Sequence, residues 1–169
     1  VLNVTPDSFS DGGLYQSAER AIARGLAMWS EGASVIDVGG ESTRPKGPAY
    51  GEGFEAVSAD EECSRIVPVI EALVAAGVLV SVDTSKGQVA CAGMDAGAAI
   101  VNDVTGGRDP NLLRAVAQAG ATLVLMHNRR DGALTRDNTA YGDVVADVRR
   151  ELNEMLATAR GHGVPDNLI

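Results

Sequence analysis

The sequence has few aromatic residues and no long apolar run. Aromatic side chains make up 4% of the 169 residues, and Trp29 is the single tryptophan. Proteins that bind single-stranded nucleic acid stack its bases on aromatic side chains, so this composition argues against such a partner. A membrane-spanning helix needs about 20 consecutive apolar residues, and no run in this sequence approaches that length. We therefore expect neither a nucleic-acid partner nor membrane insertion.

Basic residues and cysteines are also scarce. Fourteen Lys and Arg against 23 Asp and Glu give a net charge of −9, which disfavours a polyanionic partner. A small anionic ligand is compatible with this balance, because one arginine or a metal ion can hold it locally. Cys63 and Cys91 both lie in helix-like patterns, and we expect buried or partly buried free thiols in a cytoplasmic protein. A disulfide or a metal-binding pair is the less favoured alternative.

The sequence does contain a series of short apolar runs that each end in a polar residue. The runs are VLN, SVID, VSVD, AIVND and LVLMH, which end at Asn3, Asp37, Asp83, Asn102–Asp103 and Met126–His127. Short apolar runs of this kind are typical of buried parallel strands. Ligands of α/β barrels and open α/β sheets bind at the carboxyl ends of the strands. The pattern therefore predicts a site assembled from several strand ends.

Helical patterns separate these runs. They extend from Ser17 to Gly32, Ser58 to Gly77, Ser85 to Gly97, Asp109 to Gly120 and about Tyr141 to Arg160. Serine and aspartate are favourable N-caps and glycine is a frequent helix stop. Pro68 lies inside the second pattern, where we expect it to kink or restart the helix.

Strand and helix thus alternate five times, and a sixth strand is expected near Leu168. Such alternation predicts a parallel sheet. The repeat of roughly 30 residues fits a (β/α)8 TIM barrel of about 250 residues, of which about five and a half β/α units would be present. A doubly wound open sheet is the structural alternative. We expect residues 1–169 to form a single, incomplete barrel domain, cut from a longer chain at both ends.

Two loops after strand ends are rich in polar residues and glycine. Asn3 opens the first and can offer its carbonyl oxygen to a metal or its amide to a phosphate, while Asp7 and Asp11 flank Phe9 further on. A capped turn is the alternative interpretation of this loop. The second loop, residues 39–57, is longer than an ordinary βα connection, and its Arg44 can hold a phosphate or carboxylate.

Asp83 and Asn102 end neighbouring strands in this interpretation. A carboxylate and an amide side by side suit a flat heterocycle with several ring N–H groups, because buried polar groups must be paired. The alternative makes Asp83 an N-cap of the following helix. For Asp37 a structural and a functional role are equally supported, and we expect Asp103 to support Asn102.

The polar groups after the fifth run are less informative. His127 is predicted to be structural, since it lacks a second ligand at metal-binding spacing. Met126 is a candidate for the apolar floor beneath a ring, and Arg129–Arg130 is predicted to face solvent.

Taken together, these segments resemble the dihydropteroate synthases of folate biosynthesis. The shared motifs are LNVTPDSFSDGG at 2–13, DVGGESTRP at 37–45, SVDTSK at 81–86, NDVTGG at 102–107 and LMH at 125–127, in the family's order. The resemblance implies a pterin-binding TIM barrel that joins 4-aminobenzoate to 6-hydroxymethyl-7,8-dihydropterin diphosphate and releases pyrophosphate, with Mg²⁺. The reaction is SN1-like, which agrees with a set of residues that offers positioning and charge but no activated nucleophile.

The resemblance also assigns roles to individual residues. Asp83 and Asn102 would hold the pterin, with Met126 packing near it, and Asn3 would lie at the diphosphate and its Mg²⁺. Asp11 would belong to a loop that closes over the reaction. The resemblance thus implies Asp11, Arg44 and Asp83 as the catalytic residues. The 4-aminobenzoate pocket, where sulfonamides compete, would include Phe9, Thr43, Arg44 and Pro45. We expect the full-length protein to be a homodimer.

The sequence departs from the family pattern after Pro45, where KGPAYGEGFEAVSADEE replaces a shorter turn. The family's later site motifs have no counterpart in residues 1–169. A pterin-binding barrel without this activity, either a methyltransferase-type or a non-catalytic relative, is the alternative function. A metal-dependent aldolase-type barrel is a weaker third hypothesis, because no strand end carries a candidate Schiff-base lysine.

Overall fold

The computed structural model describes residues 1–4, 14–41, 57–129 and 140–169. Its strands are β1 (Leu2–Asn3), β2 (Ile36–Gly39), β3 (Val80–Asp83), β4 (Ile100–Asp103) and β5 (Thr122–Leu125). Its helices are α1 (Leu14–Ser30), α2 (Ala59–Ala75), α3 (Gly87–Asp95), α4 (Pro110–Ala119) and α5 (Val144–Gly161), followed by the 3₁₀ turn η3 (Asp166–Leu168).

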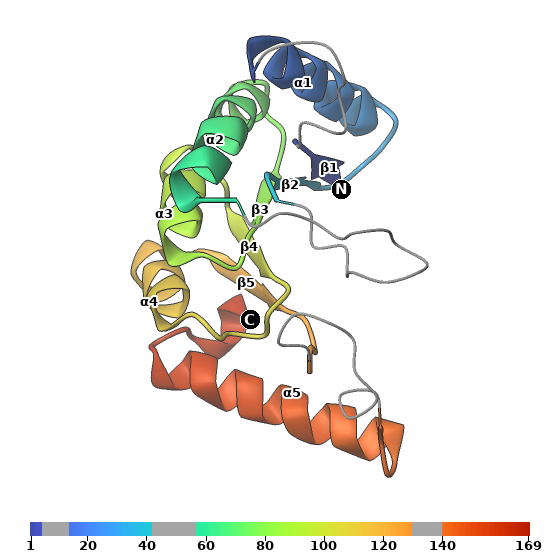
Figure 1. Ribbon diagram of the computed structural model, residues 1–169, viewed down its shortest axis with the longest axis vertical. Coiled ribbons are helices and arrows are strands. Elements are labelled where there is room, and N and C mark those ends of the chain that lie inside the picture. The colour runs from blue at the N-terminus through green and yellow to red at the C-terminus, as the bar shows by residue number, and fades with distance from the viewer. Residues whose placement is uncertain (5–13, 42–56, 130–139) are drawn as a thin grey trace.

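The strands form one parallel sheet in the order β1-β2-β3-β4-β5. Figure 1 shows α1 to α4 along one side of this sheet, and α5 follows at its β5 end. A doubly wound sheet reverses its strand order at a switch point and carries helices on both faces. The observed sequential order is that of a (β/α)8 barrel, so the barrel prediction is confirmed and the doubly wound alternative is wrong.

The two faces of the sheet carry different side chains. The helix-facing side of the sheet carries fully buried apolar side chains, among them Ile36, Val38, Val82 and Val101, with the buried Asp103 at the end of β4. Because side chains alternate across a strand, Asp37, Gly39 and the other residues in register with them share the opposite face. The helix layer therefore covers the core, and the polar strand-end side chains lie on the face away from it, which they share with apolar residues such as Val124.

Local capping explains the helix boundaries, with two corrections to the sequence predictions. Ser58 caps α2 by accepting from the Glu61 N–H, and Asp109 caps α4 by accepting from Asn111 N–H, as predicted. Ser17 does not cap α1, which already begins at Leu14. The residue that precedes α3 is Lys86 rather than Ser85, and its side chain makes no cap. Instead, the Gly87 N–H donates to Asp109 Oδ2 at 2.7 Å.

Three further predictions need comment. α2 runs without interruption through Pro68, so the helix does not restart there. The expected sixth strand is wrong, because residues Asp166–Leu168 form a 3₁₀ turn in which the Leu168 N–H donates to the Pro165 carbonyl. Both cysteines are free, as predicted, but Cys91 is exposed and only Cys63 is partly buried.

Candidate functional site

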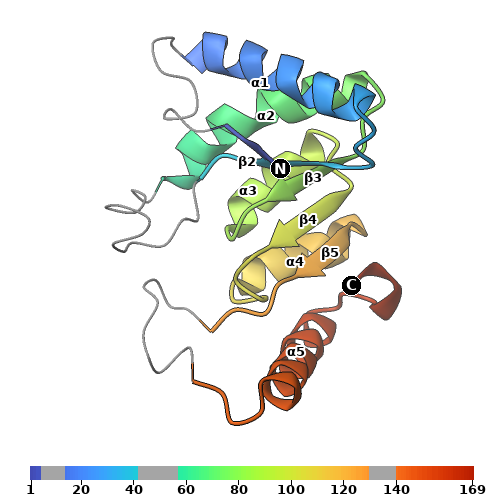
Figure 2. The same cartoon turned by 90° about the vertical axis from the view of Figure 1, so that its right-hand side faces the viewer.

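The polar strand ends lie in one row across the sheet. In the parallel register Asn3 pairs with Gly39, Gly39 with Asp83, and Asp83 with Asn102. Neighbouring residues in register direct their side chains to the same face, and Asp37 shares that face because it precedes Gly39 by two. Figure 2 shows the strands that carry this row, turned by 90° from Figure 1. The sheet therefore brings together the Asp83 and Asn102 side chains predicted to share a site.

Asp37 joins this pair through a direct hydrogen bond. Asn102 Nδ2 donates to Asp37 Oδ2 at 3.0 Å, from β4 to β2. The remaining Asp37 oxygen, Oδ1, and Asp83 Oδ1 are both buried without a hydrogen-bond partner among the described residues. A buried acceptor without a partner costs roughly 1–3 kcal/mol. Two such oxygens on one face are suited to a ligand that brings N–H donors.

The Asp83 carboxyl has a raised pKa. Burial, followed by the nearby carboxylates of Asp37, Glu62 and Asp103, raises the pKa of Asp83 from 3.8 to about 7. Gly39 leaves room for this carboxyl, since a Cβ there would lie 3.4 Å from Asp83 Oδ2. At neutral pH the group is therefore poised to hold or release a proton, and an N–H-rich ligand would favour its ionised form.

Asp103 has a different task from Asn102, because it lies on the helix-facing side of β4. Its side chain is completely buried. Oδ1 accepts from the Thr105 N–H and hydroxyl at 2.7 and 2.6 Å, and Oδ2 accepts from the Gly107 N–H at 2.7 Å. Asp103 thus fixes the turn that follows β4. It was expected to support Asn102, whereas the hydrogen bonds of its side chain hold this turn.

A partly buried ion-pair network anchors the chain just after β2. Lys86 Nζ lies 2.8 Å from Glu41 Oε2 and 2.6 Å from Glu62 Oε2. Glu41 Oε1 also accepts from the Val57 N–H at 3.0 Å, so one carboxylate holds the chain on both sides of residues 42–56. Arg65 completes the anchor by donating to the Gly40 carbonyl at 2.8 Å.

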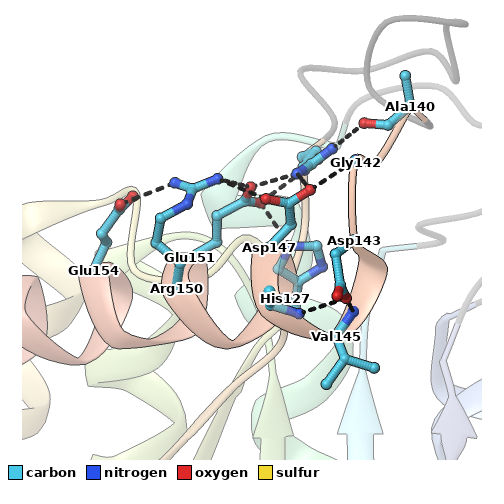
Figure 3. Close-up of polar contacts among 11 residues, drawn as sticks. His127, Ala140, Gly142, Asp143, Val145, Asp147, Arg150, Glu151 and Glu154 are labelled. Atoms are coloured by element: carbon cyan, nitrogen blue, oxygen red, sulfur yellow. Dashed lines mark hydrogen bonds and ion pairs between the residues drawn. The ribbon is translucent and has the colours of Figure 1, made fainter.

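A second polar cluster joins the chain after β5 to α5, as Figure 3 shows. His127 Nε2 lies 2.8 Å from Glu151 Oε2, and Arg129 Nε donates to the same oxygen at 2.7 Å. The Arg129 guanidinium also stacks 3.8 Å from the centre of the Tyr141 ring. The hydrogen bonds from Arg129 and His127 lower the pKa of Glu151 to about 2.

This cluster decides two predictions about the residues after β5. His127 has the structural partner that was expected for it. Arg129 was predicted to face solvent, which is wrong, because its side chain is 19% exposed and engaged by Glu151 and Tyr141. Arg130 lies outside the described residues. Arg129 and Glu151 also border an open hollow of about 520 Å³ between the loop after β4 and α5, and none of the predicted site residues lines it.

The structure places four of the predicted site residues. Asp83 and Asn102 are partly buried in the central row, whereas Asn3 is exposed at the end of β1. Met126 directly follows β5 and is 38% exposed. Five others lie outside the described residues: Phe9, Asp11, Thr43, Arg44 and Pro45.

Sequence reasoning missed the residues that support the site. Glu62 lies in the acidic run Asp60-Glu61-Glu62, which looks like a solvated helix end, yet its side chain is 1% exposed. Glu41 and Lys86 lie inside two of the shared motifs, but no periodicity pairs positions so far apart in sequence. Asp37 carried a usable signal, because it is a polar residue at the end of an apolar run, although the register pairs it with Ser81 rather than with Asp83.

The donor groups of the described residues decide whether a metal ion fits. No group of three or more His, Cys, Asp or Glu side chains arranged to bind a metal occurs within the described ranges. Mg²⁺ needs few protein ligands when substrate phosphates supply the others, and an amide oxygen is a suitable hard ligand. The exposed Asn3 side chain at the end of β1 fits such a minimal site. In the part of the chain that the structure describes, no helix has the length and apolar character needed to cross a membrane.

A parallel sheet in sequential order, with acceptor-rich strand ends, defines the class as an α/β barrel protein whose strand ends are suited to a small ligand that carries N–H donors. Comparison with protein families sharpens this class, because the family described as "Pterin binding enzyme" matches residues 1–169. The chain belongs to the pterin binding enzyme family.

Named relatives agree with this assignment. The dihydropteroate synthase of Mycobacterium leprae is 48% identical over 172 residues, which cover 100% of this chain and 58% of the relative. The structure of Xanthomonas albilineans dihydropteroate synthase with 4-aminobenzoic acid has a TM-score of 0.83 at 45% identity, covering 99% of this chain and 57% of that one. The Yersinia pestis enzyme in a sulfonamide drug complex has a TM-score of 0.84 at 39% identity, covering 98% and 58%. The chain thus spans a little over half the length of each of these proteins.

Proposed function

We propose that the full-length protein is a dihydropteroate synthase. It would join 4-aminobenzoate to 6-hydroxymethyl-7,8-dihydropterin diphosphate, forming 7,8-dihydropteroate and pyrophosphate. The observation that carries the proposal is the row in which Asp83 and Asn102 lie in register, with Asp37 bonded to Asn102. The dihydropteroate synthases found among relatives and solved structures support the same activity.

Asp83 and Asn102 are proposed to bind the pterin ring. The ring presents N–H donors, and the row offers a carboxylate and an amide held in adjacent strands. Pairing with these donors would satisfy buried acceptors that have no partner among the described residues. Met126, which follows the neighbouring strand β5, would contribute apolar contact.

Asn3 is proposed to contact the diphosphate and Mg²⁺ from the end of β1. When bound, the Mg²⁺ ion supplies positive charge that stabilises the departing pyrophosphate. The chain's own part is to orient the pterin so that its methylene carbon loses the diphosphate and meets the arylamine. No side chain of the row is an activated nucleophile, which fits a dissociative substitution.

The second substrate is proposed to bind residues that lie outside the described ranges. Phe9, Thr43, Arg44 and Pro45 are the candidates for the 4-aminobenzoate pocket, and Asp11 and Arg44 join Asp83 as candidate catalytic residues. Sulfonamides would then compete at this pocket, in keeping with the sulfonamide complex of the Yersinia pestis relative. We further propose a cytoplasmic homodimer for the full-length protein.

The activity test supplies the full-length protein with pterin diphosphate, 4-aminobenzoate and Mg²⁺. We expect pyrophosphate to appear in proportion to the 4-aminobenzoate consumed, and activity to fall when Mg²⁺ is chelated. Pterin binding without any turnover would overturn the synthase assignment and favour a pterin-binding relative of another activity.

The role of Asp83 has its own test. Asp83→Asn should weaken binding of 6-hydroxymethylpterin by at least 100-fold, because the amide offers the ring one acceptor where the carboxylate offers two. Asp95→Asn, at an exposed position on α3, is the matched control and should leave affinity unchanged. Equal affinity of Asp83→Asn and the wild type would exclude this role.

The aldolase-type alternative loses support from the state of Lys86. Schiff-base chemistry requires a neutral amine, which proteins obtain by lowering the lysine pKa. Burial works in that direction at Lys86, but its hydrogen bonds to Glu41 and Glu62 outweigh burial and raise the pKa. This ammonium is therefore held charged as an anchor.

A further inference from the structure

Asp37 is connected to the proposed pterin site without being among the residues expected to bind the ring. Its side chain lies on the same face as Asp83 and Asn102, and Oδ2 accepts from Asn102 Nδ2 at 3.0 Å. Both the bond and the unpartnered Asp37 Oδ1 are in a partly buried setting where an unpaired polar atom is costly. The contact therefore constrains Asn102 strongly.

The chemistry of the contact gives it a direction. A carboxylate can only accept hydrogen bonds, whereas an amide has one accepting and one donating end. Asn102 must consequently turn its NH₂ group towards Asp37, which fixes the directions in which Oδ1 and the second N–H can meet a ligand. In an uncharged environment the amide could equally well face the other way.

We propose that Asp37 is a positioning residue that fixes the orientation of the Asn102 amide, so that Asn102 presents an acceptor to the bound heterocycle. The inference rests on the proposed pterin-binding function and deepens it. With one Asn102 N–H bonded to Asp37, the Asn102 Oδ1 is held where it can accept from a ligand beside the Asp83 carboxylate. The fixed amide then favours a ring edge whose N–H group lies opposite Oδ1.

A double-mutant cycle tests whether Asp37 acts through Asn102. Affinity for 6-hydroxymethylpterin is measured by titration calorimetry on the full-length wild type, Asp37→Asn, Asn102→Ala and the double variant. Measurement at pH 9 keeps Asp83 ionised in every variant, because this pH lies well above the wild-type Asp83 pKa of about 7. We expect Asp37→Asn to weaken binding by about 10-fold when Asn102 is present. The same substitution should weaken binding by less than about 2-fold when Asn102 is already alanine. Equal losses in both backgrounds would overturn the proposal.

A second readout needs no ligand and no activity. In ¹H–¹⁵N spectra the Asn102 side-chain amide protons should exchange slowly in the wild type and lose that protection in Asp37→Leu. Asn128, whose Nδ2 donates to the Val104 carbonyl at 2.7 Å, is the matched control and should be unaffected. Fast exchange at Asn102 in the wild type would contradict the proposal even if no Asp37 variant folds. Protection at Asn102 without synthase activity would instead separate the two proposals, sinking the function and leaving the positioning role intact.

Discussion

Lys86 pairs with Glu62 at 2.6 Å although the Glu62 side chain is 1% exposed. The same ammonium reaches Glu41, and Glu41 holds Val57, so one lysine stands at the centre of the anchor beside the strand-end row. Burying these charges is costly unless all of them are paired. Each member of the network is therefore sensitive to loss of the others.

Lys86→Met should destabilise the protein by about 3–5 kcal/mol, because it leaves the buried Glu62 carboxylate without its partner. The free energy of unfolding is measured by urea titration at pH 7. Arg24→Met is the matched control, since it breaks the pair with Glu31 between side chains that are 55% and 61% exposed. That control should cost at most about 1 kcal/mol, and a comparable loss in both variants would contradict the anchoring role.

The raised pKa of Asp83 predicts a particular pH dependence. Its pKa is about 7 in the folded protein against 3.8 in the reference state, so the folded form binds the extra proton. The stabilisation is complete below pH 3.8 and is lost as pH rises to about 7, by roughly 4 kcal/mol over the window. Asp83→Asn should be more stable than the wild type at pH 8 and similar to it at pH 4. Thermal melts compared with Asp95→Asn at both pH values check this, and a pH-independent difference would contradict it.

The Glu151 cluster should respond to acid with the opposite sign. Hydrogen bonds from Arg129 and His127 hold the pKa of Glu151 at about 2, below its ordinary value of 4.5. Its stabilisation is therefore present above pH 4.5 and disappears as pH falls towards 2. Glu151→Gln should lower the melting temperature at pH 7 and increase hydrogen exchange in α5, with the difference from the wild type vanishing near pH 2. Glu154→Gln, on an exposed carboxylate of the same helix, should change neither.

Gly40 is constrained by close packing against α2. A Cβ at this position would lie 2.9 Å from Ile66 Cγ2 and 3.2 Å from the Glu62 carbonyl oxygen. Gly40→Ala should therefore destabilise the protein by about 1–3 kcal/mol in a urea titration. Gly161→Ala is the control, because nothing lies within 4 Å of the added Cβ, and it should be neutral or stabilising. Equal stabilities of the two variants would show that α2 yields to the added methyl group.

Much of the fold followed from local patterns. Apolar runs of strand length predicted all five strands, because the strands of a parallel α/β sheet are covered on both faces and therefore read as short, nearly continuous apolar segments. Ser58 and Asp109 identified two helix starts, since their side chains cap N–H groups within their own turn. The start of α3 was missed because its first N–H is satisfied by Asp109, from a different loop.

The sequence by itself determined the strand-end residues Asp83 and Asn102, because the polar group that stops an apolar run is visible locally. Only the tertiary structure decided that Asp37 holds Asn102, and that Lys86 binds both Glu41 and Glu62. These contacts join residues from different β/α units, whose register is set by the sheet and by packing of the helices. Burial then raises the pKa of Asp83 and makes the loss of the Lys86 partner costly for the Glu62 carboxylate. Neither register nor burial is carried by the order of residues in any one segment.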